Sequence, residues 1–116
     1  MLAVGERLWG QVDDQVCRMA SGLSGGVGGT HQELCGALSG GALIIGAIHG
    51  RTRPDEDDSL CRNLVARYRE RFAQELGSTC CQALRDSGYG SDGTTPCSVL
   101  VGQATGVLLE TLALKE

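Results

Sequence analysis

The amino-acid sequence predicts an all-α protein, a compact bundle of about five helices around a Gly-rich, buried central helix. Apolar side chains recur every four residues from Leu60 to Leu76, which is typical of one face of a helix. Residues that favour helix N-caps, such as Asp13, precede the apolar segments. Glycines that favour helix ends, such as Gly77, follow them. No segment shows the strict alternation of apolar and polar residues that predicts a strand. At 116 residues, the chain is expected to form a single domain, 1–116.

The first part of the chain is predicted to form two short helices and a glycine-rich loop. Residues 2–9 have the pattern of the tail of a helix that Gly10 closes. Asp13 and Asp14 are suited to cap a second helix that runs to about Ser21. Residues 21–29 carry five glycines in nine positions, so this loop either bends sharply or lets another group approach its backbone.

The third helix, residues 31–49, is expected to lie at the centre of the bundle. Thr30 suits its N-cap, Glu33 completes a capping box, and Gly50 is a C-terminal stop. Apolar residues occur on every face of this helix, which is typical of a buried helix. Glycines roughly one turn apart, Gly36, Gly40 and Gly41, leave a strip without side chains that allows a neighbouring helix to pack closely. Residues 34–50 are uncharged, but they are short for a membrane span and contain five glycines, which favours a buried helix.

The fourth helix is the clearest in the sequence. It follows a polar connection over residues 51–58, where Pro54 and the four acids after it suit the positive end of a helix. Arg62, Arg69 and Glu70 take the face opposite to its apolar stripe. The predicted buried stripe comprises Leu60, Leu64, Val65, Tyr68, Phe72 and Leu76.

Two more helices complete the predicted fold. After Gly77, Ser78 opens a short helix over residues 79–85, and residues 86–94 form a second glycine-rich loop. Thr95 and Pro96 supply the cap and first-turn residue of a last helix that runs to about Leu114. Its predicted buried stripe comprises Val101, Ala104, Leu108 and Leu112.

Composition and charge narrow the class of protein. The net charge of −4 and the four aromatic residues disfavour a nucleic-acid binder, which needs surplus basic side chains and stacking rings. The first twenty residues lack the pattern of a signal peptide, so we expect a cytoplasmic protein with no membrane partner. Cytosolic reductants keep thiols reduced, so the six cysteines are expected to be ligands, redox thiols or small core residues.

Most of the cysteines are predicted to lie near the starts of helices. Cys80 and Cys81 fall in the first turn of the short helix, Cys97 in that of the last helix, Cys17 near a start, and Cys35 about one turn after Thr30. Unpaired N–H groups and aligned peptide dipoles make such positions locally positive, which is expected to lower the thiol pKa. Cys97 shares the stripe of the last helix and is therefore expected to face inward.

Two cysteines and both histidines have structural alternatives. Cys61 lies inside an apolar stripe, where a small core residue is favoured over a reactive thiol. For Cys17 both interpretations stay open. His31 stands four residues before Cys35 and could project from the same helical face, although a polar first-turn residue is favoured over a ligand. His49 is too far along the helix to join the same site and is expected to face solvent.

Two other segments could suggest sites. Residues 21–29 could cradle an anion, but they lack the strand–loop–helix setting and the Gly-Lys-Ser/Thr ending of a phosphate loop. The acids at residues 55–58 are better explained as a solvated helix start than as paired catalytic carboxylates.

The run Cys35-Gly36-Ala37-Leu38-Ser39-Gly40 is the centre of a longer pattern. A glycine-rich stretch precedes it, and the run Leu76-Gly77-Ser78-Thr79-Cys80-Cys81 and then Cys97 follow it. In this order and approximate spacing, nearly the whole chain resembles the redox-active family named for its C_GCAxxG_C_C pattern. The resemblance implies that the family cysteines are Cys35, Cys81 and Cys97, while Cys80 takes a neighbouring position that is often not cysteine.

The resemblance also leads us to expect that two features are missing from this chain: the family's first cysteine and a covalent haem. In that family the first cysteine lies in an N-terminal helix well before the glycine-rich segment, and we expect this chain to begin after it, with Cys17 closer to the loop. The family is similar to a domain of split-Soret cytochromes. The C-x-x-C-H motif is absent, so no covalent haem is expected.

The leading hypothesis is a thiol-based redox or metal-binding protein in which helix packing brings Cys35, Cys81 and Cys97 together. Soft thiolates suit zinc or an iron–sulfur cluster, and a further ligand could come from Cys17, Cys80, His31, substrate or the second subunit of a homodimer. Without metal, one thiolate attacks a disulfide and a second resolves it. Cys81 then pairs with Cys35 or Cys97, because a disulfide between the neighbours Cys80 and Cys81 is strained.

The partner of such a protein would be a redox protein or a small thiol or disulfide. The alternative is a non-catalytic helical interaction or oligomerisation module, in which buried cysteines are structural and the glycine strips serve subunit packing.

Overall fold

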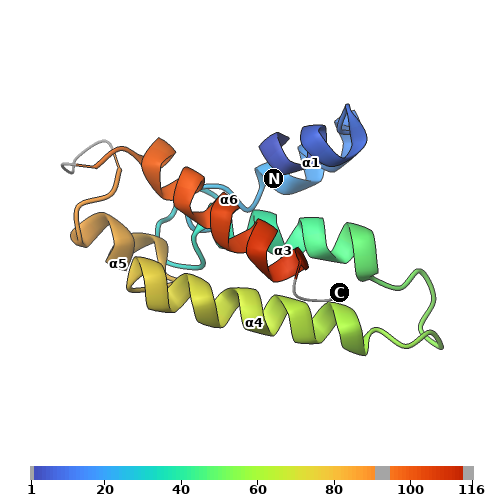
Figure 1. Cartoon of the computed structure of the whole chain (residues 1–116). Coiled ribbons are helices and arrows are strands. Elements are labelled where there is room, and N and C mark those ends of the chain that lie inside the picture. The colour runs from blue at the N-terminus through green and yellow to red at the C-terminus, as the bar shows by residue number, and fades with distance from the viewer. Residues whose placement is uncertain (1, 91–94, 114–116) are drawn as a thin grey trace.

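The computed structural model describes residues 2–90 and 95–113, and this part of the chain is all-α, as predicted (Figure 1). The described residues also form two isolated β-bridges, between Leu34 and Cys80 and between Tyr89 and Thr95. The predicted loop positions 91–94 and the predicted end at Leu114 lie outside the described residues. The helices in this part of the chain are α1 (Leu2–Trp9), α2 (Asp14–Ser21), α3 (Gly36–His49), α4 (Ser59–Leu76), α5 (Cys81–Asp86) and α6 (Cys97–Ala113).

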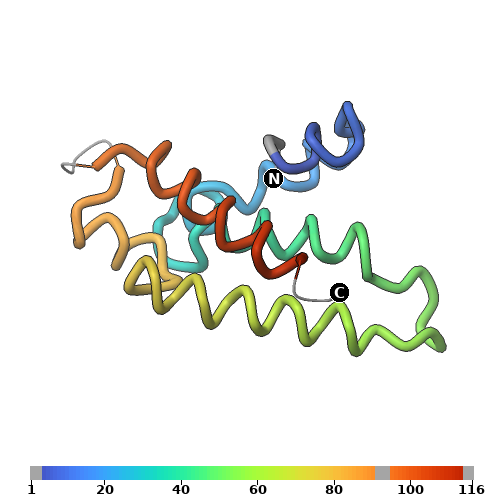
Figure 2. The backbone as a smooth tube through the Cα atoms, in the orientation of Figure 1, coloured from blue at the N-terminus to red at the C-terminus, as the bar shows by residue number. Residues whose placement is uncertain are grey.

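The three long helices α3, α4 and α6 pack against one another and form the core. Figure 1 shows α1 and α2 to one side of them, and α5 at the end of the bundle where α6 begins. The tube in Figure 2 shows that the connection between α3 and α4 lies at the opposite end. The largest fully buried side chains in this part of the chain are Ile44, Ile45, Tyr68, Phe72, Leu84 and Thr111.

The contact between α3 and α4 depends on one glycine. A Cβ atom on Gly41 would lie 2.4 Å from Cε2 of Tyr68, so this position must lack a side chain. The Tyr68 hydroxyl donates a hydrogen bond of 3.0 Å to the carbonyl oxygen of Ala37. Its ring meets that of Phe72 edge to face, with centroids 6.0 Å apart. The predicted close approach is therefore found at Gly41.

The capping residues predicted from the sequence are found at several helix ends. The Asp13 carboxylate accepts a hydrogen bond of 2.8 Å from the Gln15 amide at the start of α2. Gly77 ends α4 in the left-handed conformation, with φ of 92°. The Ser78 hydroxyl accepts a bond from the Cys80 amide, and α5 begins at Cys81, two residues later than predicted.

The predicted start of the central helix is wrong. Thr30 is not its N-cap and Glu33 does not form a capping box, because α3 begins at Gly36 with Cys35 as N-cap. His31 has a φ of 62°, which a helix cannot contain. The backbone of this segment instead forms hydrogen bonds with residues 79–82, an arrangement that no local pattern reveals.

The structure also corrects three burial predictions. Leu60 is 47% exposed, so the buried stripe of α4 starts at Leu64, which is 6% exposed. Val101 is 43% exposed, and α6 buries Leu100 and Val107 instead. The central helix is covered on the sides that face α4 and α6, but its remaining side is open. Its exposed apolar residues are Leu43, Ala47 and Ile48.

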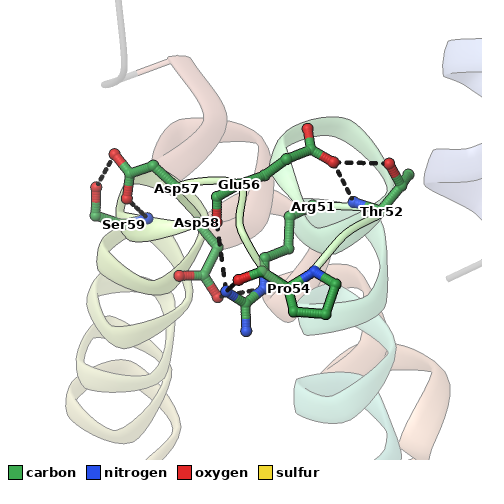
Figure 3. Close-up of polar contacts among 7 residues, drawn as sticks. All are labelled: Arg51, Thr52, Pro54, Glu56, Asp57, Asp58 and Ser59. Carbon is green, nitrogen blue, oxygen red and sulfur yellow. Dashed lines mark hydrogen bonds and ion pairs between the residues drawn. The ribbon is translucent and has the colours of Figure 1, made fainter.

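The polar connection before α4 is held by its own side chains (Figure 3). Arg51 donates to the carbonyl oxygens of Pro54 and Glu56 and forms an ion pair with Asp58. The Thr52 hydroxyl donates a bond that lowers the pKa of Glu56. The side chains of Glu56, Asp57 and Asp58 thus make contacts within the loop and at the helix start.

Candidate functional site

A short antiparallel backbone ladder joins the segment before α3 to the start of α5. The Cys35 amide donates to the Thr79 carbonyl at 2.8 Å, and the Cys81 amide donates to the Glu33 carbonyl at 2.9 Å. These two bonds flank the bridge between Leu34 and Cys80. Cys35 and Cys81, which are 46 positions apart in the sequence, are thereby placed on paired segments at the starts of two helices.

The register of this ladder separates the neighbours Cys80 and Cys81. Successive residues of an extended segment project to opposite faces, so Cys80 shares a face with Leu34, whereas Cys81 shares one with Cys35. The contacts agree with this geometry. The Cys80 thiol meets the carbonyl oxygen of Gln32 at 3.8 Å, while Cys81 and Cys35 line a common cavity.

A second pairing brings Cys97 to the same place. The Gly90 amide donates to the Thr95 carbonyl at 2.8 Å, and the Thr95 amide donates to the Gly88 carbonyl at 2.9 Å. These bonds hold the chain beside the end of α5, two residues before α6 begins at Cys97. The starts of α3, α5 and α6 therefore gather at one end of the bundle (Figure 1).

The three cysteines Cys35, Cys81 and Cys97 line one cavity of about 200 Å³. We call it the cysteine cavity. Besides the cysteines, its wall comprises Ser24, Gly25, Gly36, Ala37, Leu84, Arg85, Tyr89, Leu100 and Val101. Three thiols that are far apart in the sequence thus line a common cavity.

The glycine-rich loop forms one side of this cavity. Gly26 is buried with φ of 72°, and a Cβ atom there would lie 2.7 Å from the Cβ of Cys81. The amides of residues 27–31 donate to carbonyls of residues 22–27 within the loop itself. Glycine therefore serves the close approach to Cys81, and these amides are committed to the loop and not to an anion.

Burial decides the protonation of Cys35. The amides of Ala37 and Leu38 donate to its sulfur, which lowers its pKa as expected for a helix start. Desolvation outweighs them, and the nearby thiols of Cys81 and Cys97 add to the rise, so the pKa lies above the ordinary 9.0. The predicted lowering is therefore wrong for Cys35, which is a neutral thiol at pH 7.

Cys81 is held neutral for the same reason, although it has a cationic neighbour. Desolvation raises its pKa, the Arg85 guanidinium one turn later on α5 lowers it, and Cys97 raises it again, with a net rise. Arg85 belongs to the cavity wall but was not predicted as a site residue. Its spacing of four residues from Cys81 is the sequence signal that could have identified it.

The remaining candidates lie elsewhere or differ from expectation. Cys97 is exposed and does not face the core, because the first turn of α6 extends beyond the packed helices. Cys17 and Cys80 do not line the cysteine cavity. His31 shares no helical face with Cys35, since it lies in the loop before α3. Cys61 packs partly buried against the core, as the structural interpretation predicts.

The residues as placed do not form a metal site. Within residues 2–90 and 95–113, no three side chains of His, Cys, Asp or Glu are grouped closely enough to hold a metal ion. Cys17 and Cys80, the predicted further ligands, do not line the cavity that the three thiols share. Among the described residues, a closed tetrahedral set of ligands such as zinc or an iron–sulfur cluster requires is therefore not found. In the same part of the chain, every helix is too short or too polar to span a lipid bilayer.

Fold and site together define a class: an all-helical thiol protein in which three helix starts present cysteines to one cavity. The chain matches the family described as "Putative redox-active protein (C_GCAxxG_C_C)" over residues 1–111, and it belongs to that family. The resemblance predicted from the sequence is therefore confirmed. Searches of curated proteins and of solved structures found no match to the chain.

Proposed function

We propose that this protein is a thiol–disulfide redox protein that stores two electrons in the cysteine cavity. The observation that supports this function is the meeting of Cys35, Cys81 and Cys97, from three separate helix starts, on one small cavity. Two thiols in such a place can be converted into one disulfide without unfolding the chain.

Exposure assigns the first step to Cys97. Its thiol is the exposed one of the three, so a partner disulfide reaches it first. The Cys97 thiolate attacks one sulfur of the partner disulfide, which forms a mixed disulfide and releases the other sulfur as a thiolate that takes up a proton. The partner is a redox protein or a small disulfide.

The second step closes a disulfide within the protein. Cys81 loses its proton beside Arg85, and its thiolate attacks the Cys97 sulfur, which forms the Cys81–Cys97 disulfide and releases the second partner thiol. In sum, the protein loses two electrons and two protons, and the partner disulfide gains them.

The ladder geometry favours Cys97 over Cys35 as the partner of Cys81. Cys35 faces Thr79 across the ladder, so Cys81 is its diagonal neighbour. Such neighbours have Cα atoms about 7–8 Å apart. A disulfide usually spans roughly 4.4–6.8 Å, so a Cys35–Cys81 bond requires backbone movement. Cys35 is then a buried third thiol, which can exchange with the disulfide after the first bond has formed.

Thiol counting tests the function. The reduced protein is treated with glutathione disulfide, the free thiols are counted by maleimide labelling, and the new bond is mapped by mass spectrometry. We expect the wild type to lose two of its six thiols and to form the Cys81–Cys97 bond. Cys81→Ser should stop the reaction at the mixed disulfide of Cys97 with glutathione, and the matched control Cys80→Ser should still form the Cys81–Cys97 bond because Cys80 lies on the opposite face.

Two outcomes contradict the proposal. If all thiols of the folded wild type stay free and react only after unfolding, the cysteines are structural. If anaerobically purified protein holds stoichiometric zinc, or iron with acid-labile sulfide, the cysteines serve a metal centre, and the thiol–disulfide function is replaced.

A further inference from the structure

A second, larger cavity opens beside the cysteine cavity. Its volume is about 440 Å³, and it shares three wall residues with the first: Ser24, Gly36 and Val101. We call it the apolar trough. Its other wall residues are Cys17, Ala20, Ser21, Leu23, Gly40, Leu43 and Thr105, so it runs between α2, α3 and α6.

The trough offers almost no polar contact to a ligand. Within the described part of the chain, no charged side chain lines it. The hydroxyls of Ser21, Ser24 and Thr105 donate their protons to the backbone carbonyls of Cys17, Ser21 and Val101, at 3.0, 2.9 and 2.8 Å. A charged group, or a carbonyl that needs a donor, would find few free hydrogen-bond donors there. The wall is therefore suited to a neutral, aliphatic group.

Two exposed side chains favour filling the trough. Leu43 is 38% exposed and Val101 is 43% exposed, and both line the trough, Val101 at the border with the cysteine cavity. Covering them removes apolar surface from water, which favours an aliphatic occupant. The wild-type chain therefore has an uncovered apolar surface that continues directly from its reactive thiols.

The two volumes are complementary. Ligand pockets usually span roughly 300–1,000 Å³. The cysteine cavity alone falls below that range and the trough lies within it, so the smaller space suits the reacting sulfurs and the larger one suits the rest of the molecule. We infer that the substrate is a dithiol, or its cyclic disulfide, with a neutral aliphatic arm that binds in the apolar trough. This inference rests on the proposed thiol–disulfide function.

The chemistry balances with such a dithiol as reductant of the oxidised protein. One substrate thiolate attacks the Cys97 sulfur, the Cys81–Cys97 bond breaks, and Cys81 leaves as a thiolate that takes up a proton. The second substrate thiolate then attacks the substrate sulfur of the mixed disulfide, which closes the cyclic disulfide and releases the Cys97 thiol. Two electrons and two protons pass from the dithiol to the protein.

Two dithiols that differ in their arm test the inference. Dihydrolipoamide carries a neutral aliphatic arm, and dithiothreitol does not. The rate constant for reduction of the oxidised protein is measured with each and divided by the rate constant of the same dithiol with glutathione disulfide, which corrects for intrinsic reactivity. We expect dihydrolipoamide to be favoured by at least about tenfold, the effect of burying two or more methylene groups.

A matched pair of variants locates the effect. Leu43→Glu places a charge in the trough and should reduce the preference for dihydrolipoamide to near unity. Ile48→Glu changes an equally exposed residue of α3, at 41%, that does not line the trough, and should keep the preference. The wild-type comparison of the two dithiols needs no variant and so does not depend on how either variant folds.

The outcomes separate the two proposals. Equal normalised rates for both dithiols, or a preference that survives Leu43→Glu, overturn the inference while the thiol–disulfide function stands. Failure of the wild type to form any internal disulfide overturns the function itself.

Discussion

The cysteine end of the bundle and the α3–α4 seam are built in opposite ways. In the seam, Gly41 lets Tyr68 lie directly on α3, and fully buried side chains leave no room. At the cysteine end, backbone hydrogen bonds and left-handed glycines hold three thiols around a cavity of about 200 Å³. The seam provides stability through packing, whereas the cysteine end keeps space for chemistry. Substitutions in the two regions should therefore affect different properties.

The largest effect is expected from truncating the seam. Leu64→Ala should lower the free energy of unfolding by about 2–5 kcal/mol, because the packed core cannot fill the resulting space. Leu60→Ala, one turn earlier on α4 but exposed, should change it by less than about 1 kcal/mol. Urea denaturation under reducing conditions measures both values. Equal losses would show that the seam extends to Leu60.

A glycine pair on α3 sharpens the same comparison. Gly41→Ala should cost about 1–3 kcal/mol of unfolding free energy, since its methyl group overlaps the Tyr68 ring. Gly46→Ala meets nothing within 4 Å and should stabilise the helix by up to about 1 kcal/mol. Thermal unfolding of the two variants gives the sign of each change. A stable Gly41→Ala protein would contradict the close packing of α3 on α4.

At the cysteine end, substitutions at two glycines distinguish the cost of backbone strain from the effect of a contact with Cys81. Gly26→Ala and Gly28→Ala both place a side chain at positive φ, at a cost of about 1–2 kcal/mol. A Cβ at Gly26 also meets the Cβ of Cys81, whereas at Gly28 it meets nothing within 4 Å. Gly26→Ala alone should therefore slow disulfide formation, by several-fold, in the thiol-counting assay. Identical rates in the two variants would remove the loop from the site.

The smallest effect concerns pH. Burial raises the pKa of Cys35 above 9.0, so the unfolded chain releases this proton at lower pH than the folded chain does. The contribution to stability is complete below pH 9 and is lost as the pH rises toward the folded pKa.

Urea midpoints at pH 7.5 and 9.5, measured on reduced protein, test this dependence. The decrease should be smaller in Cys35→Ala than in the wild type. It should be unchanged in Cys17→Ala, which alters a cysteine of α2 outside the cysteine cavity. A wild-type midpoint that stays constant over this range would contradict a raised Cys35 pKa.

Local patterns predicted much of the fold because their physical causes are local. Asp13 caps α2 through a contact two residues away, and Gly77 ends α4 because its own φ is positive. The four-residue period found Leu64, Tyr68, Phe72 and Leu76. The same period included Leu60 wrongly, since whether a stripe is covered at its end depends on how far the neighbouring helices extend.

For the candidate site, the pattern of cysteines identified the three that meet, through the family resemblance and the helix starts. It did not reveal that residues 31–35 lie outside the central helix and pair with residues 79–82, because the partner segment is distant in the sequence. The expected lowering of the Cys35 pKa failed for a related reason. The helix-start contribution is local and present, but burial is a property of the whole packed structure and outweighs it.

By itself, then, the amino-acid sequence determined the all-helical class, the ends of most helices and the family of the chain, since periodicity, caps and motifs act within a few residues. Only the tertiary structure decided that Cys97 is the exposed thiol and that Arg85 lines the cavity, and only it explains why Cys81 and not Cys80 enters the cavity. The physical reason is register: a shift of one residue in the ladder would exchange the two neighbouring cysteines, and that register is set by hydrogen bonds between distant segments.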